Sequence, residues 1–257
     1  MSRTAIEADH ESVTQSATTG VRPKQVTIVL VHGAWANASS WDKVISLLLA
    51  KGQRVIAVPL PLTSLEDDLA ATNRIVADTE GPIVLVGHSW GGMAVTQAGV
   101  DPKVAALVYV SAFAPDVGES GGSLIGAHPT PQALSTIVTD SAGFVYQTSE
   151  GMLTNIAPDV PAEQARVLAV TQGRLAGKAF EQTVAVAAWK TKPSWFIVTA
   201  DDRVVSPELQ AASATRMQAK TTVIHSSHMS LLSHPGDVAA VIEDAVTRVQ
   251  SSGAIAA

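Results

Sequence analysis

A serine framed by glycines is the strongest chemical motif in this sequence. The motif reads Gly87-His88-Ser89-Trp90-Gly91, and it stands between the apolar run PIVLV and a segment of helical pattern. A strand-to-helix turn this tight strains the backbone of its serine, and glycine on either side removes the Cβ atoms that would clash. The hydroxyl then projects beside a helix N-terminus, whose dipole favours developing negative charge. The pattern predicts Ser89 as a nucleophile rather than as an idle residue of a glycine-rich turn.

A second motif, His32-Gly33-Ala34-Trp35, follows the first apolar run of the chain. A serine that attacks a carbonyl group needs two N–H donors about 2.7–3.1 Å from the developing oxyanion. We expect the backbone N–H groups of Ala34 and Trp90 to be these donors, because such turns present N–H groups toward the serine. His32 is expected to shape the turn and not to react.

Six short β-branched runs alternate with longer segments of helical period, and these elements must position the motifs. The runs cover residues 26–31, 54–58, 82–87, 104–110, 194–199 and 221–226, and the helical segments cover 40–50, 65–78, 91–100, 207–219 and 235–249. Continuous apolar strands are typical of a parallel sheet covered on both faces. Their alternation with helices predicts an α/β fold with one doubly wound, mostly parallel sheet of about six strands.

One connection between strands is unusually long. About 75 residues separate the fourth and fifth runs, whereas a connection between a strand and a helix usually has 2–6 residues. We expect residues 113–189 to form an insertion with structure of its own, with helical composition over 162–188 and a Gly/Pro-rich loop over 118–131. The predicted domain organisation is a single domain over 25–250, a disordered tail over 1–24 and a frayed tail over 251–257.

Five sequence motifs in a fixed order resemble the small α/β-hydrolases, in the branch of bacterial esterases related to plant methylesterases and hydroxynitrile lyases. The motifs are VLVHGAW, VGHSWGG, VYVSAFAPDVGES, SWFIVTADDRVVSPELQ and SSHMSLLSHP, and the resemblance spans about residues 26–249. It implies the α/β-hydrolase fold, a helical cap after the fourth strand, no cofactor, and a Ser-Asp-His triad in that chain order.

The resemblance also implies where the acid and the base lie, namely in loops after the last two strands. We expect Ser89, Asp202 and His228 to form the triad, with His228 as the base and the carboxylate fixing its tautomer. Asp201 remains the alternative acid; Asp202 is preferred because a short apolar loop and a helix-opening proline follow it in the family's register. His225 is expected to be packed on the last strand, and His234 to have a capping or surface role.

The resemblance implies hydrolysis of a small, largely apolar carboxylic ester through an acyl-enzyme. We expect an apolar pocket formed by Trp35, Phe113, Phe144, Tyr146 and Met152. Lyases of this branch usually carry a threonine after the first-strand histidine and a lysine after the catalytic histidine; Gly33 and Met229 stand here and favour hydrolysis. Hydroxynitrile lyase, C–C or lactone hydrolase, and ligand-binding receptor remain alternative functions.

The composition excludes several kinds of partner. The net charge is −6 without a Lys/Arg cluster, so nucleic acid is not an expected partner. No apolar run approaches the ~18 residues of a membrane-spanning helix, and no secretory signal is visible, so we expect a cytoplasmic protein that does not bind membranes. The absence of cysteine excludes thiolate sites, and His225 and His228 lack a third metal ligand nearby, so no metal site is expected. The expected partner is a small-molecule ester, and the oligomeric state is left open.

Overall fold

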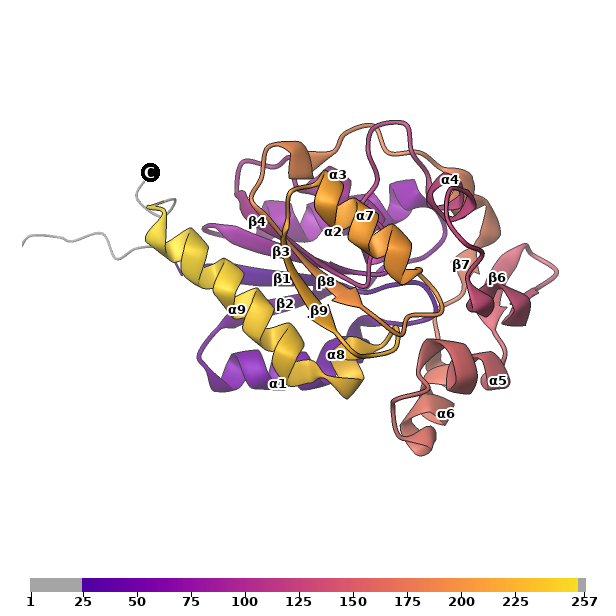
Figure 1. Ribbon diagram of the computed structural model, residues 1–257. Helices are drawn as coiled ribbons and strands as arrows, with labels where there is room; N and C mark the ends of the chain where they lie inside the picture. The colour runs from indigo at the N-terminus through magenta and orange to yellow at the C-terminus, as the bar shows by residue number, and fades with distance from the viewer. Residues whose placement is uncertain (1–24, 254–257) are drawn as a thin grey trace, which may run out of the picture.

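The computed structural model describes residues 25–253, whose centre is a six-stranded parallel sheet (Figure 1). The order of strands across the sheet is β2-β1-β3-β4-β8-β9. Their bounds are β1 (Thr27–Val31), β2 (Arg54–Val58), β3 (Ile83–His88), β4 (Val104–Val110), β8 (Ser194–Thr199) and β9 (Lys220–Ile224). Each apolar run that predicts a strand falls within two residues of an observed one, and the predicted α/β fold class is confirmed.

Helices cover both faces of the sheet, as the doubly wound prediction requires (Figure 1). One face carries α1 (Asp42–Ala50), α8 (Ser230–Ser233) and α9 (Pro235–Ser251), and the other carries α2 (Leu65–Asp78), α3 (Gly91–Ala98) and α7 (Pro207–Arg216). Side-chain caps fix two of the starts: Ser64 accepts a hydrogen bond from the Asp67 N–H, and Ser206 accepts one from the Leu209 N–H. The two helical layers therefore shield the central strands of the sheet from water.

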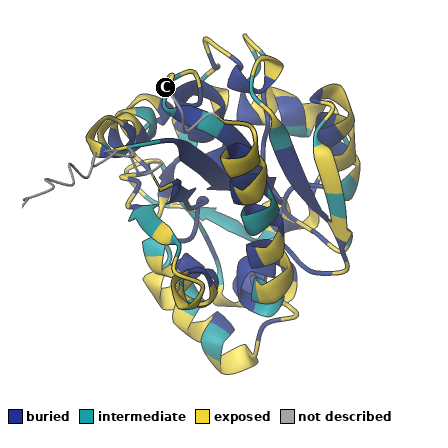
Figure 2. Ribbon diagram, turned by 90° about the vertical axis from the view of Figure 1, so that its left-hand side faces the viewer, coloured by how far each residue is buried: buried dark blue, intermediate teal, exposed yellow. Residues whose placement is uncertain are grey.

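The central strands are buried along their whole length, which explains why they lack an alternating pattern. Every residue of β1 and of β3 is buried, and the dark blue strands lie inside the molecule in Figure 2. The edge strand β9 differs, since four of its five residues are exposed or half-buried. Burial on both faces is the physical reason that apolar runs alone predict the central strands.

The insertion between β4 and β8 lies at one end of the sheet, on the right in Figure 1. Its helices are α4 (Gly121–Gly126), α5 (Ser149–Gly151) and α6 (Ala162–Thr171), joined by short 3-10 and π turns. It also contains a three-stranded antiparallel sheet in the order β5-β6-β7, formed by β5 (Ile137–Thr139), β6 (Phe144–Gln147) and β7 (Leu175–Ala176). The insertion is therefore mixed in secondary structure rather than purely helical.

Two expectations about the insertion are wrong in detail. Within residues 162–188 the α-helix ends at Thr171, because the following residues pair with β6 to form β7. Within residues 118–131, the expected loop contains α4, which begins with a capping box in which Ser120 and Ser123 bond each other's backbone N–H groups.

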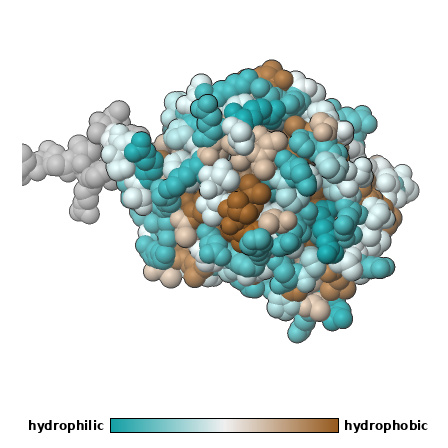
Figure 3. Space-filling model, viewed as in Figure 1, coloured by the Kyte–Doolittle hydropathy of each residue, from teal (hydrophilic) through white to brown (hydrophobic). Residues whose placement is uncertain are grey.

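The described residues stop short of both chain ends. The predicted tail over 1–24 lies outside the described residues, as do residues 254–257, while the helix α9 continues to Ser251, beyond the predicted end of the domain at 250. No helix within 25–253 combines the length and the apolar character needed to cross a membrane. On the face shown in Figure 3, hydrophilic and neutral surface predominates and apolar surface is confined to small areas.

Candidate active site

Ser89 occupies a strained turn between β3 and α3. Its φ is +52°, a left-handed conformation that is unusual for a residue with a side chain. A Cβ atom at Gly91 would lie 2.6 Å from the Val31 carbonyl oxygen, and one at Gly87 would lie 2.9 Å from the Gly92 nitrogen. Both glycines are therefore required by close approach of neighbouring backbone, as the motif predicts.

Neighbouring backbone holds this turn from both sides. The Ser89 N–H donates to the Val110 carbonyl oxygen at the end of β4 (3.1 Å), and the Phe113 N–H donates to the Ser89 carbonyl oxygen (3.2 Å). These two bonds fix the serine between the end of β4 and the first residue of the insertion. A local conformation this costly persists because the surrounding structure determines it.

The loop after β1 passes directly against the serine. A Cβ atom at Gly33 would lie 2.6 Å from the Ser89 Cβ, so only glycine allows this approach. Within residues 25–253, neither the Ala34 N–H nor the Trp90 N–H donates a hydrogen bond, although both residues are buried. An oxyanion hole needs two N–H donors that the fold does not already use, and within the described residues these two groups meet that condition.

Both ring nitrogens of His32 are used in hydrogen bonds to the backbone. Its Nε2 accepts a hydrogen bond from the Leu60 N–H (2.9 Å), so its Nδ1–H donates to the Gly33 carbonyl oxygen (2.8 Å). Burial lowers the pKa of the imidazole below its usual value, which keeps the ring neutral. This environment agrees with the expectation that His32 shapes the turn.

Asp202 and His228 form a buried pair in the loops after β8 and β9. The His228 Nδ1 lies 2.8 Å from the Asp202 Oδ2, and the two side chains are 2% and 0% exposed. The other carboxylate oxygen accepts hydrogen bonds from the N–H groups of Val204 (2.7 Å) and Val205 (3.1 Å). The carboxylate is thereby fixed in orientation, and it fixes the tautomer in which His228 Nδ1 carries the proton.

The second ring nitrogen of His228, Nε2, is buried and makes no hydrogen bond within the described residues, to Ser89 or to any other residue. The ring of His88, the residue before the serine, lies 4.7 Å from the His228 ring, and its Nε2–H donates to the His228 carbonyl oxygen (3.0 Å). Burial, with the neighbouring His228, lowers the pKa of His88 well below its usual value, so His88 is a neutral donor that holds the histidine loop against the serine turn.

Asp201 and His225 lie together at the surface instead. Their side chains are 67% and 88% exposed, and the closest ring nitrogen and carboxylate oxygen are 4.0 Å apart. The expectation that His225 is packed on the last strand is wrong, because β9 ends one residue earlier, at Ile224. His234 precedes α9 and makes no side-chain cap, and its Nδ1 contacts the Ser233 hydroxyl.

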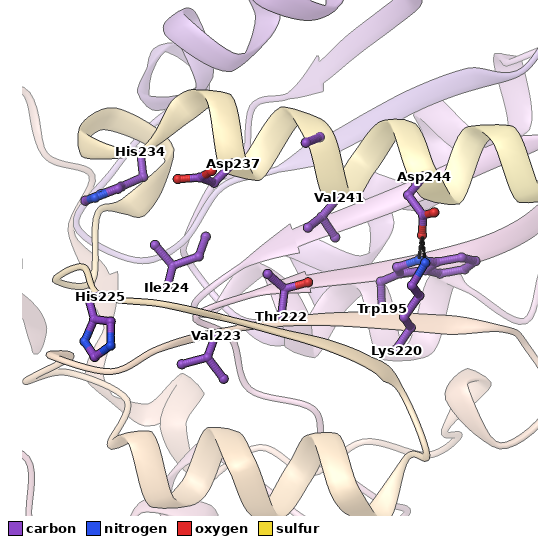
Figure 4. Close-up of a pocket in the computed structure, with 11 residues that line it drawn as sticks. Trp195, Lys220, Thr222, Val223, Ile224, His225, His234, Asp237, Val241 and Asp244 are labelled. Atoms are coloured by element: carbon purple, nitrogen blue, oxygen red, sulfur yellow. Dashed lines mark hydrogen bonds and ion pairs between the residues drawn. The ribbon is translucent and has the colours of Figure 1, made fainter.

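An open groove between β9 and α9 holds these two competing histidines (Figure 4). The groove also contains Asp237 and the Lys220–Asp244 ion pair. Ser89, Asp202 and His228 do not line it. This groove is therefore separate from the candidate active site.

A narrow, mostly apolar cavity contains Ser89, which is only 3% exposed. Trp35 and Phe113 line it, as the sequence predicts, together with Ala34 and Trp90. The remaining lining residues come from the insertion and from the loop after Asp202: Ile125, Ala133, Leu134, Phe180 and Val204. Sequence reasoning missed these five; only Val204, two residues after Asp202, carried a positional signal.

Three predicted pocket residues lie outside this cavity. Phe144 lines a separate cleft between the insertion and the start of α2. The Tyr146 ring packs under the Arg174 guanidinium, 4.1 Å from the ring centroid. Met152 is buried inside the insertion itself, at 1% exposure. The prediction for these residues is wrong because aromatic and sulfur-containing side chains serve equally well in the core of the insertion.

Comparisons with known proteins identify a family and several similar hydrolases. Residues 28–241 match the family described as alpha/beta hydrolase. Carbendazim hydrolyzing esterase of Nocardioides sp. (strain SG-4G) is 27% identical over 155 residues, which make up 55% of this chain and 62% of that protein. Pyrethroid hydrolase of Sphingobium wenxiniae is 28% identical over 251 residues, with 84% of this chain and 86% of that protein covered.

Plant proteins and their structures are similar as well. Methylesterase 2 of Arabidopsis thaliana is 33% identical over 108 residues, or 36% of this chain and 41% of that protein. The matched segments thus span less than two thirds of this methylesterase and of the carbendazim esterase. The crystal structure of polyneuridine aldehyde esterase superposes with a TM-score of 0.75 at 21% identity, covering 86% of this chain and 99% of that one, which supports the same fold.

Proposed function

The chain belongs to the alpha/beta hydrolase family, and we propose that it is a serine esterase that cleaves a small, largely apolar carboxylic ester through an acyl-enzyme. The family resemblance indicated by the sequence motifs is thereby confirmed. Relatives named as esterases and hydrolases support carboxylic ester hydrolysis as its reaction. The observation that carries the proposal is the buried Asp202–His228 pair, bonded through His88 to the turn that presents Ser89.

In the proposed first step, the Ser89 oxygen attacks the ester carbonyl carbon while His228 Nε2 takes the hydroxyl proton. Asp202 holds the Nδ1–H and stabilises the imidazolium that forms. The N–H groups of Ala34 and Trp90 stabilise the tetrahedral oxyanion. Collapse of this intermediate breaks the ester C–O bond, and His228 returns the proton to the leaving alkoxide, which departs as the alcohol.

In the second step, water replaces the alcohol. His228 Nε2 takes a proton from the water as its oxygen attacks the acyl carbon. The second tetrahedral intermediate expels the Ser89 oxygen, which recovers the proton, and the carboxylic acid leaves. No cofactor enters either step, since the protons and electron pairs are balanced by substrate, water and these side chains.

The cavity supports a neutral, apolar substrate. None of the side chains that line it carries a charge, and its walls are aromatic and aliphatic apart from Ser89 itself. A charged acyl group would lose its hydration there without gaining a partner. We propose that residues 113–189 act as the cap of this site, because half of the lining residues belong to this insertion: Phe113, Ile125, Ala133, Leu134 and Phe180.

Turnover of p-nitrophenyl acetate, butyrate and octanoate by the wild type and by Ser89→Ala tests the function. We expect Ser89→Ala to lower kcat by ~10⁴-fold or more without unfolding the protein, because the members of a triad act as a unit. A fluorophosphonate should label Ser89, as mapped by mass spectrometry. Turnover that survives in a folded Ser89→Ala variant contradicts the proposed nucleophile, and labelling without turnover of any ester favours a ligand-binding receptor.

A further inference from the structure

A buried carboxylate without a cationic partner lies behind the serine turn. Asp68, on α2, is 0% exposed. Within the described residues it forms no ion pair with a lysine, arginine or histidine. Its Oδ1 accepts a hydrogen bond from the Leu62 N–H and its Oδ2 accepts one from the Trp90 indole Nε1–H, both at 2.8 Å. The proposed reaction does not use this carboxylate.

The two hydrogen bonds require an acceptor at both oxygens. A carboxylate has acceptors only, whereas an asparagine has one acceptor and one N–H₂ donor. An asparagine at this position would therefore leave one of the two N–H groups facing another donor. Burial raises the pKa of Asp68 to about 6, and the neighbouring Asp67 adds to the increase. At neutral pH the carboxyl group is therefore still ionised, although its burial without a cation costs free energy.

One of the donors belongs to the residue that follows the nucleophile. Trp90 is 1% exposed, its indole lines the cavity, and its ring meets the Phe180 ring edge-on at 5.3 Å between centroids. Its backbone N–H is one of the two proposed oxyanion donors. Because the indole and this N–H belong to the same residue, an anchor on the indole also restrains the backbone of Trp90 beside the cavity.

The other donor belongs to a strained loop that contacts the cap. Leu62 has a φ of +60°, and its carbonyl oxygen accepts a hydrogen bond from the Ala176 N–H of β7 (2.8 Å). A single carboxylate thus connects α2, the loop that carries Leu62 and the residue after the serine. Through Leu62 it also supports the attachment of the insertion.

We propose that Asp68 is a positioning residue of the esterase: by accepting both N–H groups, it fixes the Trp90 indole and with it the cavity wall and the oxyanion donor. The inference rests on the proposed function, since it concerns the same site. Asp68 itself does not touch the substrate; it acts through Trp90. The loss of this contact should therefore appear in kcat more than in KM.

The variant Asp68→Asn tests the proposal on the full chain. We expect kcat for p-nitrophenyl acetate and butyrate to fall about 10- to 100-fold, since a displaced oxyanion donor costs rates of this order, with a smaller change in KM. Glu66→Gln is the matched control, because it removes one exposed negative charge from the same turn of α2. We expect this control to stay within about twofold of the wild type, as exposed substitutions usually do.

A double-mutant cycle with Trp90→Phe separates positioning from a general structural role. Trp90→Phe keeps the backbone N–H and an aromatic ring but removes the indole N–H. If Asp68 acts through the indole, adding Asp68→Asn to Trp90→Phe should lower kcat much less than it does in the wild type. Trp90→Phe alone, which leaves the carboxylate in place, should also lower kcat, and this result remains measurable if Asp68→Asn does not fold.

Two outcomes overturn the proposal. The first is a folded Asp68→Asn variant whose kcat equals that of Glu66→Gln. The second is an equal loss of kcat from Asp68→Asn with and without the indole N–H. Either outcome, in an enzyme that still turns over esters through Ser89, contradicts only the role of Asp68. The absence of Ser89-dependent turnover in the wild type contradicts the proposed function instead.

Discussion

Asp201 and Asp202 are neighbours in the chain, yet their side chains lie in opposite surroundings. Asp202 is buried and its carboxylate meets His228, Thr199 and two backbone N–H groups. Asp201 is two-thirds exposed, and its carboxylate lies 4.0 Å from the ring of His225 at the surface. Adjacent residues in an extended turn point in different directions, so only one of the pair can reach the buried histidine.

Paired asparagine variants test this assignment. Asp202→Asn should lower kcat by ~10⁴-fold, by analogy with the serine-protease aspartate, because the amide stabilises the wrong imidazole tautomer. Asp201→Asn is the natural control and should retain kcat within about twofold, as an exposed substitution does. The measurement is kcat for p-nitrophenyl butyrate in both variants. A larger loss at Asp201 would transfer the role of acid to that residue.

Sequence patterns were informative at this scale where the spacing is short. The strained serine follows from glycines two residues away on each side, and the proposed acid from the loop and proline that follow it. The position of His225 could not be predicted, because β-branched residues continue to Ile224 and nothing local indicates that the strand ends there. The contact between Asp68 and Trp90 was also inaccessible, since 22 residues separate the partners.

At the scale of elements, the insertion supplies half of the residues that line the cavity. Apart from Phe113, the lining residues of the insertion come from three separate pieces of it: α4, the 3-10 turn Gln132–Thr136 and the 3-10 turn Gly177–Glu181. The positions of the central strands along the chain were predictable because these strands are apolar and buried. The contents of the insertion were not, because strands of two to four residues are determined by their partners rather than by their own pattern.

Phe180→Ala should change which acyl chains the enzyme accepts. The substitution removes an aromatic wall of the cavity, so kcat/KM for p-nitrophenyl octanoate relative to acetate should rise about tenfold or more, since each methylene in an apolar pocket is worth roughly that factor. Tyr146→Ala is the matched control, because it removes a half-buried aromatic ring of the insertion that does not line the cavity. Equal chain-length profiles in the wild type and in Phe180→Ala would show that selectivity is determined elsewhere.

At the scale of the whole molecule, Asp68 makes the free energy of unfolding depend on pH. Its pKa rises from 3.8 to about 6 on folding, mainly through burial. A carboxyl group whose pKa is higher in the folded state contributes stability that is full below about pH 4 and is lost as the pH rises through about 6. The proposed role requires Asp68 to be ionised. The protein therefore has a lower free energy of unfolding in this form than it has with Asp68 protonated.

Comparison with Asp68→Asn measures this contribution. Between pH 4 and pH 7, the wild type should lose on the order of 3 kcal/mol of unfolding free energy relative to the variant, since two pKa units correspond to about that amount. Urea unfolding of both proteins across this pH range is the measurement, and Glu66→Gln should follow the wild type. A difference that stays constant with pH would show that Asp68 has the same pKa in the folded and unfolded chains.

Because Ser89 lies in a narrow cavity, the steps of the proposed reaction must occur in a fixed order. With the serine 3% exposed in a narrow cavity that the insertion helps to line, the proposed function requires part of the cavity wall to move before an ester can reach it. In the proposed reaction the chamber must be dry while the acyl group is transferred to the serine, yet it must admit a water molecule before that group can be released. The frequency with which the wall opens therefore sets an upper bound on the turnover rate, however fast the bond-breaking steps are.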